Sequence, residues 1–299
     1  MEMNWTGVYP ALTTKFYPGG GIDLGSCLRG VDAQVEAGVS GLILSGTLGE
    51  ASVLSTDEKR SLTREVVRHL NGRLPVVVNI AEGATDEAVR RAAEARDDGA
   101  SGLMILPPMR YTGDHRELVA FFKEVASATS LPVMIYNNPV DYKTLVTPEV
   151  FDELLQLDQV QAVKESTRDV SNVTRLIGRY GDRLKVLCGV DTLALESFLL
   201  GAHGWVAGLV CAFPRESVAL FNLARAGRLA EAVALYRWFM PLLELDIHPK
   251  LVQYIKLAEQ MTGLGTEHVR KPRLPLEGEE RERIQAIIRK GLETRPSLA

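Results

Sequence analysis

The chain has few cysteines and no long apolar run, and each of these absences excludes a class of protein. Its three cysteines, Cys27, Cys188 and Cys211, are odd in number, widely separated and without CxxC spacing. This pattern indicates reduced, packed thiols in a cytoplasmic protein and argues against a zinc site. The longest apolar run, "WVAGLVCAF" at 205–213, is far shorter than the ~20 residues that a membrane-spanning helix needs.

The charge and the N-terminus exclude two further classes. A net charge of −4 with mixed signs argues against a nucleic-acid-binding surface, which requires a basic stripe. The first residues, "MEMNWTGVYP", show no basic region followed by an apolar stretch, so we expect no secretory signal. The 299 residues, 46% of them apolar and 24% charged, suffice for a sizeable core and suit an α/β barrel, which routinely reaches about 250 residues.

Short β-rich runs alternate with amphipathic segments along most of the chain. The segments at 56–71, 85–98, 115–129 and 170–180 are typical of helices, and Ser55-x-x-Glu58 is a capping-box pattern at the start of the first. Near-continuous apolar strands between helices predict a parallel sheet covered on both faces. The expected strands are eight in number: 7–14, 41–46, 75–80, 102–107, 132–138, 160–166, 184–189 and 204–209.

Eight such units predict an α/β fold of the (β/α)8 TIM-barrel type rather than an open doubly wound sheet. The first expected strand is not followed by GxGxxG, which weakens the dinucleotide-binding alternative. After the eighth strand the pattern is purely helical, at 215–226, 228–244, 249–262 and 278–291. We therefore expect a barrel over 1–225 and a C-terminal helical subdomain over 226–299.

One strand ends in a lysine. "VQAVKEST" at 160–167 is apolar until Lys164. A lone lysine at a strand tip can lay its stem on apolar surface and reach water, or it can lose its proton to burial and act as a nucleophile. In a (β/α)8 barrel the C-terminal ends of the strands carry the active site. Lys164 ends the sixth strand, so we expect it in a pocket or beside one.

Other candidate residues lie at the same level of the predicted barrel. Glycines around Thr47, in "SGTLGEAS" at 45–52, free backbone N–H groups for a carboxylate or phosphate, although a plain βα turn has the same pattern. Tyr136 ends the strand before that of Lys164 and is within reach of it, unless its ring only packs. Gly189 allows close backbone approach, and Asp191 fits a helix N-cap better than a catalyst. The five histidines lie away from the expected strand ends, and no metal-binding cluster accompanies these residues.

A lysine, a tyrosine and an anion-binding turn at one barrel mouth suit Schiff-base catalysis on a 2-oxo acid. A free lysine has a pKa of ~10.4, so only about one molecule in a few thousand is neutral at pH 7. Burial must lower that pKa, and a fall to ~7 corresponds to roughly 4–5 kcal/mol. The neutral amine then attacks the carbonyl, and the resulting iminium withdraws electrons from the adjacent carbon.

These motifs resemble the dihydrodipicolinate synthase / N-acetylneuraminate lyase superfamily over nearly the whole chain. The resemblance lies in "GTLGE", "YNNP", "VKEST", "CGVD", "GAHGWVAG" and the extra C-terminal helices. It implies a barrel lyase that forms a Schiff base through Lys164, with Tyr136 as proton shuttle. Thr47 and the amide of Leu48 would bind the carboxylate, with the Thr47 hydroxyl in the proton relay. Gly189, Val206 and Asp141 complete the expected substrate-binding set. The resemblance implies no cofactor and a homotetramer built as a dimer of dimers.

Departures from the family pattern bear on the substrate. The synthase carries a second threonine where this chain has Leu48, and an arginine that resembles a carboxylate clamp where this chain has Asp141. An aspartate there would repel a semialdehyde carboxylate, with Lys143 a candidate to compensate. At the position of the synthase's interfacial tyrosine the chain has Met109, with Tyr111 two residues later. These differences argue against lysine biosynthesis.

"YNNPxxY" without the arginine resembles the branch that deaminates 1-pyrroline-4-hydroxy-2-carboxylate in hydroxyproline breakdown. That substrate has a single carboxylate and yields 2,5-dioxopentanoate and ammonia. We expect such a cytoplasmic deaminase, a lyase whose last step is a hydrolysis. A pyruvate-dependent aldolase or 4-hydroxy-tetrahydrodipicolinate synthase is the alternative. A ligand-binding paralogue without turnover is another.

Overall fold

Eight parallel strands form the centre of the molecule in a computed structural model, which describes residues 3–108 and 111–298. The hydrogen-bonded order is β1-β8-β7-β6-β5-β4-β3-β2, and a parallel bridge between Ala11 and Ile43 joins the two end strands. The predicted (β/α)8 barrel is confirmed. The strands are β1 (Gly7–Pro10), β2 (Leu42–Leu44), β3 (Val76–Ile80), β4 (Gly102–Ile105), β5 (Val133–Asn137), β6 (Val160–Glu165), β7 (Lys185–Cys188) and β8 (Gly204–Ala207).

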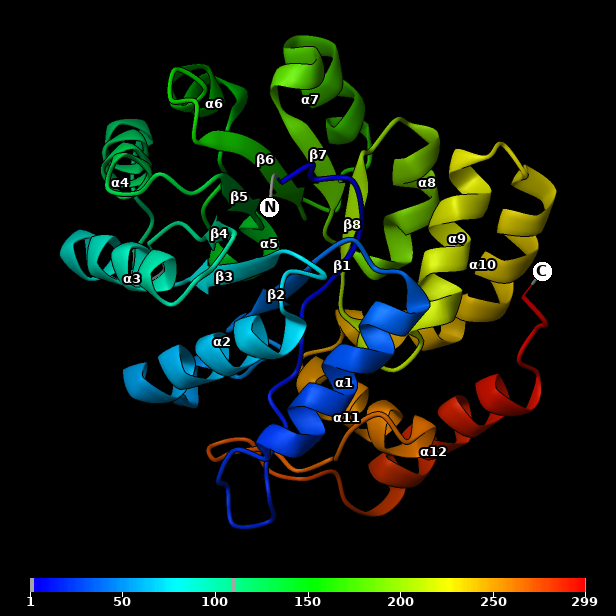
Figure 1. Cartoon of the computed structure of the whole chain (residues 1–299). Coiled ribbons are helices and arrows are strands. Elements are labelled where there is room, and N and C mark those ends of the chain that lie inside the picture. The colour runs from blue at the N-terminus through cyan, green and yellow to red at the C-terminus, as the bar shows by residue number, and fades with distance from the viewer. Residues whose placement is uncertain (1–2, 109–110, 299) are drawn as a thin grey trace.

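Helices surround the barrel (Figure 1). The eight helices whose ranges were predicted have bounds within two residues of those ranges, and Ser55 forms the predicted capping box with Glu58. The helices up to the eighth strand are α1 (Leu24–Ala37), α2 (Thr56–Leu70), α3 (Thr85–Asp97), α4 (His115–Ser127), α5 (Pro139–Tyr142), α6 (Pro148–Leu154), α7 (Ser171–Tyr180) and α8 (Ala194–Leu199). The later helices are α9 (Pro214–Arg225), α10 (Leu229–Leu243), α11 (Leu251–Thr262) and α12 (Gly278–Glu293).

The C-terminal helices reach back to the barrel. Helix α10 packs on α8 and α9, and α12 packs on α10 and α11, at the yellow-to-red end of the chain in Figure 1. Between α10 and α11 the short turn η5 (Glu244–Ile247) packs on η3 (Asp191–Leu193), which directly follows β7. Segments far apart in sequence therefore meet beside the carboxyl end of β7.

The barrel strands are almost entirely buried, as their apolar composition predicts. The three cysteines are buried and unpaired. Within the described ranges, no helix combines the length and the apolar character needed to cross a membrane.

Candidate active site

Lys164 and Tyr136 stand side by side at the carboxyl ends of β6 and β5. The two residues are direct partners in the strand register. The Nζ of Lys164 lies 4.2 Å from the centroid of the Tyr136 ring, and each residue is 8% exposed. The predicted proximity is confirmed. Burial lowers the pKa of Lys164 below its ordinary 10.5, because the barrel interior disfavours the charged form.

Among the described residues three lysines are buried, and of these three only Lys164 has an amine without a side-chain partner. The Nζ of Lys15 is 2.7 Å from Glu259, and the Nζ of Lys256 is 2.6 Å from Glu50. No side-chain hydrogen bond or ion pair of the described residues involves the Nζ of Lys164. A buried amine without a partner is easier to deprotonate than one held by a carboxylate. The structure thus distinguishes the candidate nucleophile from the two structural lysines.

Two tyrosines and a threonine supply hydroxyls next to this amine. The Oγ1 of Thr47 lies 2.9 Å from the hydroxyl of Tyr142, whose ring meets that of Tyr136 edge-on at 5.5 Å. The Tyr136 hydroxyl accepts a hydrogen bond from Asn138 at 3.1 Å. Burial raises the pKa of both tyrosines to about 12, so both are protonated at neutral pH.

The partner of Thr47 was missed in the sequence. The expected relay joined Thr47 to Tyr136, whereas the hydroxyl that contacts Thr47 is that of Tyr142. Tyr142 appeared there only as the last letter of "YNNPxxY". The six-residue spacing between Tyr136 and Tyr142 could have indicated this contact, because α5 brings Tyr142 back to the cavity that Tyr136 lines.

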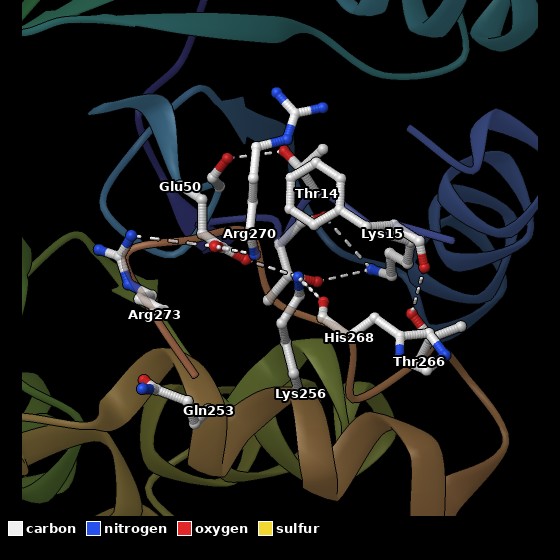
Figure 2. A network of polar contacts seen from close by, with 12 residues as sticks. Thr14, Lys15, Glu50, Gln253, Lys256, Thr266, His268, Arg270 and Arg273 are labelled. Atoms are coloured by element: carbon white, nitrogen blue, oxygen red, sulfur yellow. Dashed lines mark hydrogen bonds and ion pairs between the residues drawn. The ribbon is translucent and has the colours of Figure 1, made fainter. Parts of the chain in front are cut away.

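The turn that contains Thr47 and Leu48 rests on a buried ion-pair network (Figure 2). Glu50 follows the turn with φ +54°, a strained value for a non-glycine residue, and its amide donates to the carbonyl of Thr47 at 3.0 Å. Its carboxylate accepts from Lys256 at 2.6 Å and from the amide of Arg270 at 3.0 Å. Thr14 donates to the carbonyl of Gly49 at 2.7 Å. These bonds fix the backbone expected to bind the substrate carboxylate.

Gly189 and Val206 line the same cavity as Lys164. A Cβ on Gly189 would lie 2.1 Å from the Oγ of Ser166 and 2.7 Å from the Cγ of Lys164. The close approach predicted for this glycine is therefore present, because any side chain there would displace the lysine. All seven predicted site residues lie in the cavity wall: Thr47, Leu48, Tyr136, Asp141, Lys164, Gly189 and Val206.

Asp191 does not cap the helix that follows it, so that expectation is wrong. The residue is the first of η3, and its fully buried carboxylate crosses to the end of β8. There it accepts from the indole of Trp205 at 3.0 Å and from the amides of Gly208 and Leu209 at 3.2 and 2.8 Å. Burial raises its pKa to about 6, while these donors oppose the rise. Asp191 thus holds the turn after β8.

Asp141 lies at the cavity mouth and meets a guanidinium that the sequence analysis missed. Its carboxylate accepts from Asn138 at 2.7 Å and lies 3.8 Å from Arg168. Arg168 follows β6 with φ +63° and also lines the cavity. The compensating charge therefore comes from Arg168, since Lys143 is exposed and donates to the carbonyl of Val140. The sequence signal that could have identified Arg168 is its position four residues after Lys164.

Of the two residues compared with the synthase's interfacial tyrosine, Tyr111 is the one that the structure describes. Tyr111 is 55% exposed and is not among the cavity-lining residues. Met109 lies outside the described residues. Across the described ranges, no three His, Cys, Asp or Glu side chains are placed to hold a metal ion.

A free buried lysine, neutral tyrosines and a rigid backbone turn at a (β/α)8 barrel mouth define a class I lyase, an enzyme that works through a lysine Schiff base. The chain belongs to the dihydrodipicolinate synthetase family, whose pattern it matches over residues 4–291.

Curated relatives match over almost their whole length. The 4-hydroxy-tetrahydrodipicolinate synthase of Bacillus subtilis (strain 168) is 28% identical over 287 residues, which cover 96% of this chain and 99% of the relative. The Escherichia coli (strain K12) protein named "Probable 2-dehydro-3-deoxy-D-pentonate aldolase YjhH" is 28% identical over 290 residues, covering 95% and 96%. Among solved structures, dihydrodipicolinate synthase DapA-2 from Bacillus anthracis has a TM-score of 0.93 at 26% identity, covering 99% of this chain and 100% of that one.

Proposed function

We propose that this lyase is a 1-pyrroline-4-hydroxy-2-carboxylate deaminase. The observation that carries the proposal is the unpartnered, buried amine of Lys164, set beside one carboxylate-binding turn at Thr47 and Leu48. Asp141 occupies the place of the synthase's clamp arginine and is paired with Arg168, so the opposite side of the cavity carries compensating charges. A substrate with a single carboxylate suits this distribution.

The proposed reaction uses the named groups in sequence. The neutral amine of Lys164 attacks C2 of the cyclic imine, and the C2–N bond to the ring nitrogen breaks, which opens the ring. Tyr136 assists removal of the C3 proton, with Thr47 and Tyr142 as its neighbours in the relay. The C4–O bond then breaks, and water leaves. One proton from C5 and one from its nitrogen then pass to C3 and C4, which converts the C5 amine into an imine. Hydrolysis of this imine and of the lysine Schiff base releases 2,5-dioxopentanoate, ammonia and the lysine, and one net water is consumed because one is lost at C4 and two are added.

A second candidate is a pyruvate-dependent aldolase or 4-hydroxy-tetrahydrodipicolinate synthase. Two observations favour it. The curated relatives cited above carry those names. The guanidinium of Arg168 also faces the cavity, where it could receive a second carboxylate if Asp141 released it.

An activity panel separates the two. Purified enzyme is incubated with the hydroxypyrroline, with pyruvate plus aspartate semialdehyde, and with 2-keto-3-deoxy sugar acids. We expect ammonia release from the first and little product from the others. Efficient condensation of pyruvate with the semialdehyde would refute the deaminase assignment and leave the Schiff base intact.

Borohydride trapping tests the Schiff base itself. Reduction in the presence of pyruvate should add mass to the peptide that contains Lys164, and Lys164→Arg should abolish both the adduct and turnover because arginine keeps its proton. Lys15→Arg and Lys256→Arg are matched controls at the other buried lysines. An adduct on Lys143, or none, would refute the mechanism.

We further propose a cytoplasmic homotetramer on the basis of the family resemblance, and a division into a barrel (1–225) and a helical subdomain (226–299). Analytical ultracentrifugation tests the first. Separate expression of 1–225 tests the second, and a folded fragment would support it.

A further inference from the structure

Asp246 is a cavity residue that the proposed mechanism does not yet use. It belongs to η5, between α10 and α11, and so comes from the C-terminal helices rather than from a barrel strand. Even so it lines the cavity together with Lys164, Tyr136 and Thr47. The packing of η5 on η3 carries it there.

The Asp246 carboxyl rests directly on Gly208. A Cβ on Gly208 would lie 2.0 Å from the Oδ1 of Asp246 and 2.9 Å from the Cδ1 of Leu48. The absence of a side chain at Gly208 therefore makes room for this carboxyl, which lies over the backbone between β8 and the carboxylate-binding turn. A larger residue at position 208 would exclude the Asp246 carboxyl.

The hydrogen-bonding capacity of this carboxyl is unused. Its Oδ1 is shielded from solvent and has no hydrogen-bond partner. No hydrogen bond from a described residue reaches either oxygen, whereas the neighbouring carboxylate of Asp191 accepts from three donors. A buried polar atom left without a partner costs roughly 1–3 kcal/mol. Because the residue also lines the cavity, its carboxyl is free to bond a group held there.

The charges around Asp246 favour its protonated form. Burial raises its pKa well above the ordinary 3.8, and the carboxylates of Asp191 and Asp141 raise it further, against the opposing effect of Lys164 and Arg168. Asp141 differs, because Asn138 and Arg168 already engage it. Among the acidic residues of the cavity wall, Asp246 is the one with both a free carboxyl and a proton to give.

We propose that Asp246 is a further catalytic residue, which binds the C4 hydroxyl of the substrate and transfers a proton at its oxygen. The inference rests on the proposed function and specifies one step of it. The electron pair of the enamine forms the C3–C4 double bond, the C4–O bond breaks, and the Asp246 proton joins the departing oxygen as water. The water that hydrolyses the imines returns a proton to the carboxylate. The 2-keto-3-deoxy sugar acids also carry a C4 hydroxyl that this contact can bind. In their aldol cleavage that hydroxyl loses its proton, so the ionised form of Asp246 acts there and accepts it.

Two reactions separate this role from that of Lys164. Pyruvate has no C4, so exchange of its methyl protons in D2O requires the lysine imine and its enamine but not Asp246. Turnover of a C4-hydroxy substrate requires both. In Asp246→Asn we expect borohydride trapping and pyruvate exchange within about threefold of wild type, and turnover lower by ~10²–10⁴, the usual contribution of a general acid.

Glu244→Gln is the matched control, since it removes an exposed carboxylate from the same turn, and it should behave as wild type. Wild-type-like turnover by Asp246→Asn would overturn the inference. An equal fall in exchange and turnover would also overturn it, because it would show that Asp246 acts through Lys164 rather than at the C4 hydroxyl. If wild type cleaves the keto-deoxy acids but not the hydroxypyrroline, the deaminase assignment fails while Asp246 is still tested on the C4 hydroxyl. Turnover of neither substrate would overturn both.

Discussion

Replacing each of two buried lysines by methionine should change stability in opposite directions. Lys256→Met leaves the fully buried carboxylate of Glu50 without its 2.6 Å partner. Breaking a buried pair costs about 3–5 kcal/mol, and the lower end applies because the amide of Arg270 still donates to Glu50. Lys164→Met removes an amine with no partner among the described residues and puts an apolar chain of similar length in its place. It should stabilise the folded protein, because burial disfavours the charged form of Lys164.

Thermal unfolding at pH 7 measures the difference. At roughly 2 °C per kcal/mol, Lys256→Met should unfold about 6 °C below wild type, whereas Lys164→Met should unfold above it. The stabilisation by Lys164→Met also depends on pH, in a direction set by the pKa shift of Lys164. Because folding lowers the pKa of Lys164, the folded protein binds fewer protons than the unfolded chain, so the penalty is largest at low pH. The advantage of Lys164→Met should therefore shrink as pH rises toward 10.5. Destabilisation by Lys164→Met comparable to that by Lys256→Met would show that Lys164 is a structural lysine.

Three further predictions concern the reaction. Tyr136→Phe removes one hydroxyl and little volume, so the rate should fall by ~10²–10⁴ while the unfolding temperature barely moves; an unchanged rate would mean that the tyrosine only packs. Since only neutral Lys164 attacks, kcat/KM should rise with pH to a plateau reached below pH 10.5, and a rise that follows the pKa of a free lysine would contradict the lowered pKa. Asp141→Arg should improve inhibition by dicarboxylate ligands and leave hydroxypyrroline turnover level or lower; identical inhibition constants would show that residue 141 does not face the substrate.

The fold could be predicted from sequence because its signals are local. Apolar runs and amphipathic segments repeat eight times, and seven of the eight strands end within two residues of where the run stops, whereas β1 ends at Pro10, four residues before the predicted end. Lys164 and Tyr136 could be paired in advance because adjacent strands of a parallel barrel place their last residues side by side. The role of Gly189 could likewise be predicted, because a glycine at a strand end indicates that another group approaches the backbone closely.

The rest depended on contacts between segments distant in sequence. Nothing near Lys164 shows that its amine is free while those of Lys15 and Lys256 are paired, because their partners lie 244 and 206 residues away along the chain. The sequence could not show that Asp191 would turn to β8, nor that Arg168 would face Asp141.

Asp246 is the clearest case of what only the tertiary structure decided. Its local sequence is a helix end in the C-terminal region, and its place in the cavity arises from the packing of η5 on η3 and from the space above Gly208. The sequence determined the barrel and the lysine because periodicity and strand order are properties of neighbouring residues. The charges that surround that lysine are set by long-range packing, and only the folded chain brings them together.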